Sequence, residues 1–319
     1  MNLLYHYAAN QKGFGILNDK EIRLSDIRKS NDYDEMILFF PDVLDEILRV
    51  YTDDPFDFKF DGQNGKVALS KLIESTSYMI YTEIENGGFT NFVVCFSEKP
   101  DLLSQWRGYA NNGQGICIGF SKELLMNKCA QDKSIFRLEK VIYITEKRRK
   151  EIVREVANEA IEELRVLRKW IVENMTFDDS SPDTDSLLGY NFCGLIENFM
   201  IASLKYKQIG FKEEKEWRLF LNNKAYKNPE WVVGKEHELF GPNGFSDTIS
   251  FLRNKIAFNI SDDNISPYVP LGFSELGDNI VKAIWIGPRS HISEKDLVLF
   301  LAQKGYSDIK LFFSKTSYR

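Results

Sequence analysis

The sequence predicts an α+β fold, with a mixed, mainly antiparallel sheet at its core and an inserted helical region. Strand-length apolar runs are mixed with helical patterns, without the regular strand–helix–strand alternation of a doubly wound protein. The longest helical pattern, over residues 146–175, stands between the central apolar runs and the later ones. We therefore expect a single α+β domain over residues 1–319, with a helical insertion at about 146–205.

The individual elements follow from local patterns. A short apolar run predicts a strand over residues 3–7, and a helix after it ends near Asp19. Helical patterns then cover residues 34–50, restarted at Pro41, and residues 66–85, with a loop between them. Further strands are expected at residues 91–97, 115–120, 134–145, 255–260, 281–286 and 309–313, and further helices at 101–110, 122–128, 187–205 and 293–304.

Composition excludes some classes of protein. The chain carries 41 Lys and Arg against 47 Asp and Glu, a net charge of −6, which disfavours a general nucleic-acid coat but allows a local basic groove. The four cysteines form no C-x-x-C pair, so we expect reduced thiols in a cytosolic protein. No apolar stretch approaches the roughly 18 residues of a membrane span, and no signal-peptide pattern is present. We expect a soluble, cytoplasmic protein with no membrane partner.

The clearest candidate site is Glu214-x-Glu216-x-Arg218. If this segment is a strand, its period of two places the three polar groups on one face and Lys215 on the other. Two carboxylates and a guanidinium are costly to gather unless they pair, bind a ligand or do chemistry. Glu213-x-Lys215, half of a metal-dependent nuclease motif, would lie on the opposite face, so the two interpretations compete.

Aromatic and basic side chains form a second candidate. Trp106, Arg107 and Tyr109 share one short helical segment, which can stack on a flat ring while the guanidinium pairs with a phosphate. The alternative is that Trp106 anchors the core and Arg107 forms an ordinary ion pair. In the strand over residues 3–7, His6 points away from its two tyrosine neighbours, and a structural hydrogen bond is one role for it. The chain has only 3 histidines, so we expect no metal site built on them.

Short motifs of aromatic, glycine and charged residues are spread along nearly the whole chain. In order, they are Tyr5-His6-Tyr7, Asn31-Asp32-x-x-Glu35, Cys95-Phe96-Ser97, Gln105-Trp106-x-x-Tyr109-Ala110, Gly115-Ile116-Cys117-Ile118-Gly119-Phe120, Glu214-x-Glu216-Trp217-Arg218, Ile286-Gly287-Pro288 and Ser314-x-x-Ser317-Tyr318-Arg319. This ordered set resembles the bacterial family of domains of unknown function numbered 2971 (DUF2971). The resemblance implies no established activity.

A second resemblance concerns the order of an early His strand, a central aromatic segment and a later E-x-E strand. That order is similar to NAD-dependent ADP-ribosyltransferases, which implies a fold of that kind with NAD as the cofactor. His6 would contact the nicotinamide ribose, Tyr109 would stack on the cofactor, and Glu216 would stabilise the positive charge that develops on the ribose. Arg107 or Arg218 would hold the pyrophosphate. The candidate catalytic residues are thus Glu216 and Glu214, and the candidate cofactor-binding residues are His6, Trp106, Arg107, Tyr109 and Arg218.

Three functions remain open at this point. The first is an NAD-consuming transferase or glycohydrolase that acts as a toxin or in phage defence. The second is a metal-dependent nuclease, with Mg²⁺ ligands drawn from Asp32, Glu35, Glu214 and Glu216. The third is a non-catalytic sensor or adaptor in which the two glutamates satisfy Arg218 and Arg107. We expect a nucleotide-like small molecule as partner, with a protein or nucleic-acid target left open and the oligomeric state undetermined.

Overall fold

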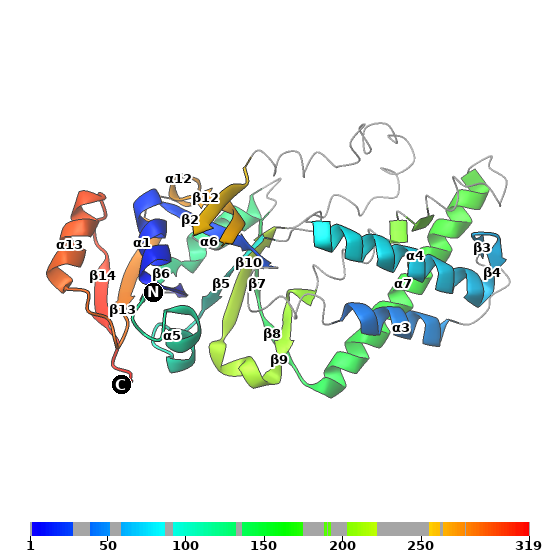
Figure 1. Ribbon diagram of the computed structural model, residues 1–319, viewed down its shortest axis with the longest axis horizontal. Coiled ribbons are helices and arrows are strands. Elements are labelled where there is room, and N and C mark those ends of the chain that lie inside the picture. The colour runs from blue at the N-terminus through cyan, green and yellow to red at the C-terminus, as the bar shows by residue number, and fades with distance from the viewer. Residues whose placement is uncertain are drawn as a thin grey trace. The chain divides into compact units, whose positions relative to one another are not determined.

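The structure is a computed structural model (Figure 1), and its mixture of helices with a mainly antiparallel sheet confirms the α+β class. It describes residues 2–27, 39–51, 59–86, 92–131, 136–174, 188–189, 191–192, 203–221, 255–261, 264–277 and 279–318. The helices are α1 (Asn10–Asp19), α3 (Phe40–Val50), α4 (Gly65–Asn86), α5 (Leu103–Tyr109), α6 (Lys122–Ala130), α7 (Glu146–Asn174), α12 (Phe273–Leu276) and α13 (Glu294–Gln303), with a 3-10 helix, η2 (Ile209–Glu214). None of the described helices is both long enough and apolar enough to span a membrane.

The chain divides into two compact units. The first unit contains residues 1–29, 92–141 and 210–319, and the second contains residues 30–91 and 142–209. The long helix α7 therefore belongs to a unit that also takes in an earlier part of the chain. That the whole chain forms a single domain with an insertion at 146–205 stays a prediction.

The first unit is built on one large sheet. Its strands are β1 (Leu3–Ala8), β2 (Glu21–Asp26), β5 (Phe92–Ser97), β6 (Ile116–Ser121), β7 (Phe136–Lys140), β10 (Glu216–Leu221), β11 (Ala257–Ser261), β12 (Asn264–Gly272), β13 (Val281–Ile286) and β14 (Lys310–Phe313). They run in the order β11-β12-β2-β5-β1-β6-β13-β14, and β10 pairs with both β5 and β7. β5 pairs with three strands. β1 and β2 pair with opposite ends of one of its edges, and β10 pairs along the other edge.

The two faces of this sheet carry different clusters. Leu4, Phe96, Ile118 and Leu219 lie on the face that holds the large hydrophobic core, which we call the core face. Buried side chains of α1, α12 and α13 join this core. The opposite face, which we call the α5 face, holds a smaller cluster around the fully buried Trp106. Its members are Tyr7, Trp106, Ala110 and Cys117, with Tyr5, Tyr109 and Trp285 packed against them.

Close backbone contacts hold the loop after α5 against the ends of β1 and β13. A Cβ on Gly115 would lie 2.1 Å from the carbonyl oxygen of Ala8, and a Cβ on Gly287 would lie 2.3 Å from that of Gly113. Gly113 has a φ of 82°, a conformation that side-chain-bearing residues rarely adopt. Glycines in the turn between α5 and β6 thus permit its backbone to touch the backbones of β1 and of the residues after β13.

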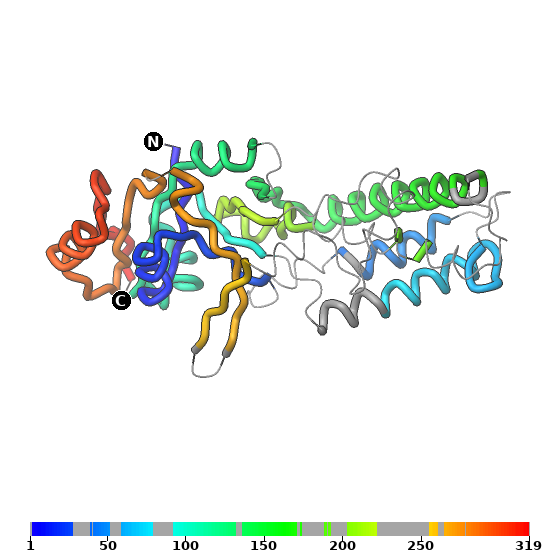
Figure 2. The backbone as a smooth tube through the Cα atoms, turned by 90° about the horizontal axis from the view of Figure 1, so that it is seen from above, coloured from blue at the N-terminus to red at the C-terminus, as the bar shows by residue number. Residues whose placement is uncertain are grey.

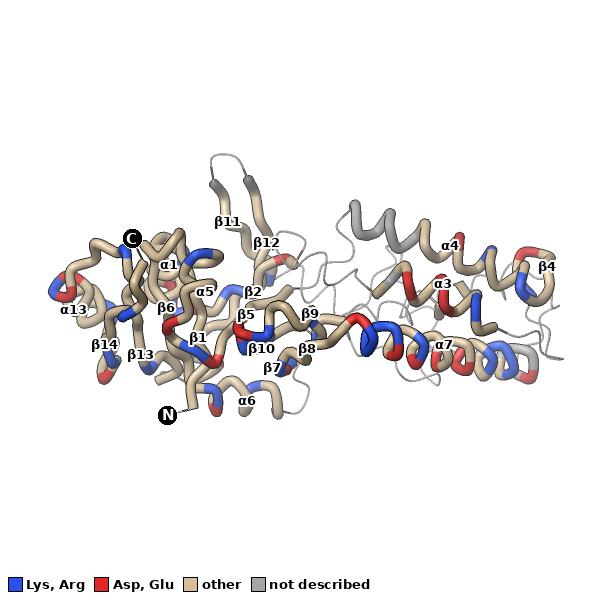
Figure 3. Tube along the Cα trace, turned by 90° about the horizontal axis from the view of Figure 1, so that it is seen from below, with Lys and Arg blue, Asp and Glu red and all other residues tan. Residues whose placement is uncertain are grey.

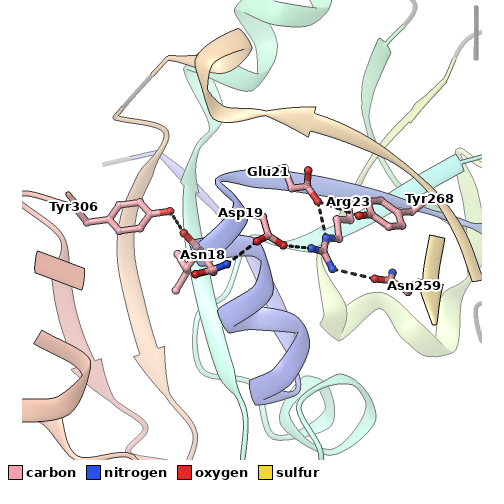
Figure 4. Close-up of polar contacts among 8 residues, drawn as sticks. Asn18, Asp19, Glu21, Arg23, Asn259, Tyr268 and Tyr306 are labelled. Carbon is pink, nitrogen blue, oxygen red and sulfur yellow. Dashed lines mark hydrogen bonds and ion pairs between the residues drawn. The ribbon is translucent and has the colours of Figure 1, made fainter. Parts of the chain in front are cut away.

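The polar contacts of Arg23, which we call the Arg23 cluster, fix the β11–β12 hairpin to β2 and α1 (Figure 4). The Arg23 side chain donates to Glu21 Oε1 at 2.8 Å and to Asn259 Oδ1 at 3.0 Å, and it also bonds to Asp19. Its guanidinium carbon lies 4.9 Å from the centroid of the Tyr268 ring. The hairpin strands themselves carry no charged residue, and Figure 3 draws them in tan. Arg23 is thus fully engaged in holding the fold together.

The second unit consists of helices with two small pairs of strands. Its strand pairs are β3 (Lys59–Phe60) with β4 (Gln63–Asn64), and β8 (Ile142–Ile144) with β9 (Tyr206–Gln208). Helices α3 and α7 run side by side in Figure 2, and ion pairs from Arg149 to Asp42 and from Arg154 to Glu46 join them. Basic and acidic residues alternate along α7 (Figure 3). Several of these residues form ion pairs with each other within α7, so much of the charge on this helix is paired.

One predicted element differs from the structure. The single strand expected over residues 134–145 is two strands, β7 and β8, which belong to different sheets and to different units. The chain leaves the large sheet at Val141, whose N–H donates to the carbonyl of Glu216 at 3.0 Å. Strand β12 and helix α12 were not predicted. Most of the helix expected at 187–205, and the start of the one expected at 34–50, lie outside the described residues.

The contact at Gly115 gives a test of the fold. Gly115→Ala should lower the free energy of unfolding by about 1–3 kcal/mol, because its Cβ would overlap a backbone oxygen. Gly108→Ala is the matched control, since nothing lies within 4 Å of its Cβ position, and in helix α5 it should stabilise by up to about 1 kcal/mol. Chemical denaturation measures both changes. Equal effects of the two substitutions would contradict the packing described for Gly115.

Candidate functional site

Glu216 and Arg218 form a buried ion pair on the α5 face. They stand two residues apart on β10, so their side chains share that face. Arg218 Nε lies 2.7 Å from Glu216 Oε1, and one of its terminal nitrogens lies 3.4 Å from Oε2. Glu216 is 4% exposed and Arg218 is 1% exposed. The neighbouring strand β7 places Glu139 directly opposite Arg218. The guanidinium is therefore held inside the sheet among acidic side chains.

The structure does not extend the strand back to Glu214. That residue ends the 3-10 helix η2, and Lys215, with a φ of 47°, separates it from the first residue of β10. The prediction that Glu214, Glu216 and Arg218 share one strand face is thus wrong for Glu214, because the left-handed turn breaks the period of two. Glu214 is nevertheless buried, and its backbone carbonyl accepts a hydrogen bond from Ser97 Oγ at 2.6 Å.

A row of side chains crosses the α5 face at the level of Glu216. In register, Gly119 on β6 lies beside Tyr5 on β1, Tyr5 lies beside Ser97 on β5, and Ser97 lies beside Glu216 on β10. The missing side chain of Gly119 leaves room for the Tyr5 ring, whose Cε1 is 3.0 Å from where a Cβ would be. Burial, followed by nearby Cys117, raises the pKa of Tyr5 above its usual 10.0, so its hydroxyl stays protonated.

His6 lies on the other face of the sheet from this row. Its ring approaches Phe96 of the large core edge-on, and its Nδ1 lies 2.9 Å from the carbonyl oxygen of Cys95. Burial lowers the pKa of His6 below 6.5, which keeps the ring neutral at pH 7. The structure therefore does not bring His6 together with Tyr109 and Glu216, and it gives His6 the structural hydrogen bond that the sequence allowed.

The three aromatic and basic residues of the helical segment have three different environments. Trp106 is fully buried, meets Tyr7 edge-on at 4.9 Å and donates from Nε1 to Asp101 at 2.7 Å, so its ring anchors the core. Tyr109 is half-buried against the same cluster. Arg107 is exposed, and its guanidinium carbon lies 6.0 Å from the centroid of the Tyr318 ring. Only Tyr109 and Arg107 present surface to a ligand.

Asp101 joins α5 to the segment over residues 314–318. Its Oδ1 accepts from Trp106 Nε1, from Ser314 Oγ at 2.5 Å and from Thr316 Oγ1 at 2.9 Å, and its Oδ2 accepts from the Lys315 N–H at 3.0 Å. Burial alone would raise the pKa of this carboxyl, but the hydrogen bonds from Ser314 and Trp106 lower it below 3.8. The ionised carboxylate thus fixes the segment that brings Tyr318 to Arg107.

Sequence reasoning missed four residues of this region: Tyr5, Asp101, Arg289 and Tyr318. Tyr5 and Tyr318 stood in motifs that were recognised, yet no role followed from them. Arg289 directly follows the motif Ile286-Gly287-Pro288, and nothing in the sequence assigned it a role. Asp101 had no local signature, because its partners at 314–316 are more than 200 residues away in sequence. The alternation of β1 alone could have singled out Tyr5, since it predicts a face shared by both tyrosines.

Within the parts of the chain that the structure describes, no three His, Cys, Asp or Glu side chains gather closely enough to hold a metal ion. Of the nuclease carboxylates expected from the sequence, Asp32 and Glu35 lie outside the described residues. The Glu216 carboxylate faces Arg218. A Mg²⁺-dependent nuclease stays a prediction that no observation favours over the others.

Comparison with known proteins shows that part of this chain is similar to one protein family. The model of a family described as a protein of unknown function (DUF2971) matches residues 105–219, which run from α5 to β10. This confirms, for that part of the chain, the resemblance predicted from the motifs. The match includes Trp106, Arg107, Tyr109, Glu214, Glu216 and Arg218. No curated protein and no solved structure matches the sequence significantly.

The buried ion pair gives a prediction for stability. Glu216→Leu or Arg218→Met alone should each lower the free energy of unfolding by about 3–5 kcal/mol, because each leaves a buried charge without its oppositely charged partner on β10. The double variant Glu216→Leu with Arg218→Met should cost clearly less than the two single changes added together. Urea denaturation of all variants completes the cycle. Single changes that each cost below about 1 kcal/mol would show a pair worth no more than an exposed one.

The hydrogen bonds of Asp101 give a prediction for pH dependence. Because its pKa is depressed in the folded protein, the stabilisation is present above the unfolded pKa near 3.8 and is lost as pH falls through the lower folded value. Asp101→Asn should therefore destabilise by about 1–3 kcal/mol at pH 6. The difference between wild type and variant should shrink below pH 3.8. Denaturation at several pH values tests this, and a difference that is constant down to the acid limit would contradict it.

Proposed function

We propose that this protein is a non-catalytic sensor or adaptor domain that binds a nucleotide-like small molecule. The observation that carries this proposal is the burial of Glu216 in its pair with Arg218. A carboxylate that stabilises a developing positive charge has to face the reacting group. Here both oxygens face the guanidinium, and separating a buried pair is costly. The geometry thus supports a structural role for Glu216 and Arg218 in holding β10 within the sheet.

The surface chemistry of α5 supports a nucleotide-like ligand. Arg107 offers an exposed guanidinium beside the Tyr318 ring, and Tyr109, two residues later and on a different side of the helix, offers a half-buried ring. Aromatic rings stack on bases, and guanidinium groups bind phosphates through paired hydrogen bonds. The net charge of −6 favours a small ligand over a long polyanion, which would have to meet many phosphates. NAD and ADP are the first ligands to examine.

A second candidate function is the NAD-consuming transferase or glycohydrolase. The observation that favours it is the row of Tyr5, Ser97 and Glu216, because three polar side chains from adjacent strands stand side by side on the face that α5 covers. In this interpretation Tyr5 would take the place expected for His6 beside the cofactor. Glu216 would have to turn from Arg218 toward the ribose before it could act.

Nicotinamide release and ligand binding separate the two candidates. With NAD added, we expect no release that differs between wild type and Glu216→Gln, but we expect NAD or ADP to raise the melting temperature of both. Tyr109→Leu should weaken binding about tenfold while Tyr109→Phe retains it, because loss of ring stacking costs about 1–3 kcal/mol. Chromatography of the products and calorimetric titration provide the measurements.

One control variant and two contrary outcomes complete this test. Tyr268→Phe is the matched control, since that ring lies in the Arg23 cluster and should leave binding unchanged. Release of nicotinamide by the wild type that disappears in Glu216→Gln, while NAD still raises the melting temperature of that folded variant, would replace the sensor proposal with the enzymatic one. Failure of every nucleotide to bind at millimolar concentration would overturn both the ligand class and the sensor proposal.

A further inference from the structure

Two arginines from distant parts of the chain approach the same aromatic ring. The guanidinium carbon of Arg107 lies 6.0 Å from the centroid of Tyr318, and that of Arg289 lies 5.5 Å from it. Both arginines are exposed. Within the described ranges, neither forms an ion pair with a carboxylate, in contrast to Arg23, Arg149 and Arg218. The cluster of Arg107, Arg289 and Tyr318, which we call the arginine cluster, therefore combines one ring with two cations that pair with no carboxylate among the described residues.

Backbone hydrogen bonds set the spacing of the two arginines. The N–H of Arg289 donates to the carbonyl of Gly113 at 2.9 Å, and the N–H of Gly113 donates to the carbonyl of Trp106 at 2.9 Å. Trp106 immediately precedes Arg107 and is itself fully buried. The close approach of Gly287 to Gly113 brings the two segments together without intervening side chains. The side chains of both arginines thus extend from a rigid base, which reduces the cost of ordering them around a ligand.

Tyr318 is positioned by its segment more than by a bond of its own. Asp101 holds residues 314–316, whereas the Tyr318 hydroxyl reaches Asn112 Oδ1 only at 3.5 Å, the limit of a hydrogen bond. Its ring packs near Gly113, where a Cβ would meet Tyr318 Cδ1 at 3.3 Å. The ring is therefore placed by its contacts with Gly113 and the two guanidinium groups, and Asp101 holds the segment that precedes it.

We propose that the arginine cluster binds the diphosphate group of a nucleoside diphosphate, either free or as half of a dinucleotide. This rests on the proposed function and adds Arg289 and Tyr318 to it. A diphosphate carries oxygens that match the planar, multiple donors of two guanidinium groups, and its two phosphates suit two cations better than one phosphate does. The ring beside them provides a flat surface for the attached base. A nucleic acid would engage more cations than this cluster provides.

The alternative is that the two arginines only cover the tyrosine ring through cation–π contacts. That role predicts a change in stability without any ligand dependence. Lysine keeps the charge and a cation–π contact but loses the planar donors. Comparison of Arg→Gln with Arg→Lys therefore distinguishes binding through paired hydrogen bonds from simple packing.

Isothermal titration with ADP, inorganic pyrophosphate and adenosine tests the proposal. We expect ADP to bind, pyrophosphate to compete with it, and adenosine to bind at least about tenfold more weakly. Arg107→Gln and Arg289→Gln should each weaken ADP binding about tenfold, their combination about a hundredfold, and Arg289→Lys by an intermediate factor. The control is Lys295→Gln on α13, an exposed cation away from the cluster, which should leave ADP affinity unchanged.

The outcomes separate this inference from the proposed function. ADP that binds wild type and the double glutamine variant equally would overturn the arginine cluster as the site and leave the nucleotide-binding function standing. Pyrophosphate that binds in an arginine-dependent manner, without any preference for ADP, would support the cluster and overturn the nucleotide class. Tighter binding of a single-stranded oligonucleotide than of ADP, with affinity falling steeply as salt rises, would overturn the small-ligand assignment. No binding of any probe would overturn both.

Discussion

The two-residue period of β1, β5, β6 and β10, locked in register across the sheet, decides which side chains can form a site. Paired residues on neighbouring strands lie on the same face of the sheet. Once the face of one residue is known, the face of every residue paired with it across the sheet is known too. Trp217 packs into the large core, and this fixes Glu216 and Arg218 on the α5 face. By the same rule, Tyr5 joins that face and His6 is excluded from it. No movement of a single side chain can reverse this division, because the backbone pairing imposes it.

The same constraint separates two uses of arginine in the first unit. Arg218 is buried on the α5 face, where low polarity makes its charge costly unless it is paired, as it is with Glu216. Arg107 and Arg289 extend from a helix and a turn into solvent, where their charges need no carboxylate. Buried arginines of the first kind contribute to a specific arrangement of strands. Exposed arginines of the second kind form no ion pair with a carboxylate in the described part of the chain, which is why we place the ligand there and not at the buried pair.

The sequence predicted much of this fold, and the misses have physical reasons. The apolar runs that became β5, β6 and β13 are buried on both faces, and such runs are recognised without long-range information. The strand expected at Glu214 was mispredicted because of Lys215. Its left-handed backbone ends the alternation, and nothing in the residue type indicates that conformation. The role of Asp101 could not be predicted for another reason. Its carboxylate accepts hydrogen bonds from residues 314–316, which are distant in sequence, and no periodic pattern marks such a residue.

Asp101 is where the buried cluster and the proposed ligand surface meet. One of its oxygens accepts from Trp106, which anchors α5, and also from Ser314 and Thr316, which carry the chain toward Tyr318. Beyond Thr316, the Tyr318 hydroxyl forms one long hydrogen bond, 3.5 Å to Asn112 Oδ1, so Asp101 holds residues 314–316 more firmly than the Tyr318 ring is held. Arg107 follows Trp106 directly, and its backbone is therefore fixed by the same carboxylate. A ligand that moved the Tyr318 ring would thus leave the arginine base unchanged, and binding would require only a local rearrangement of the segment after Thr316.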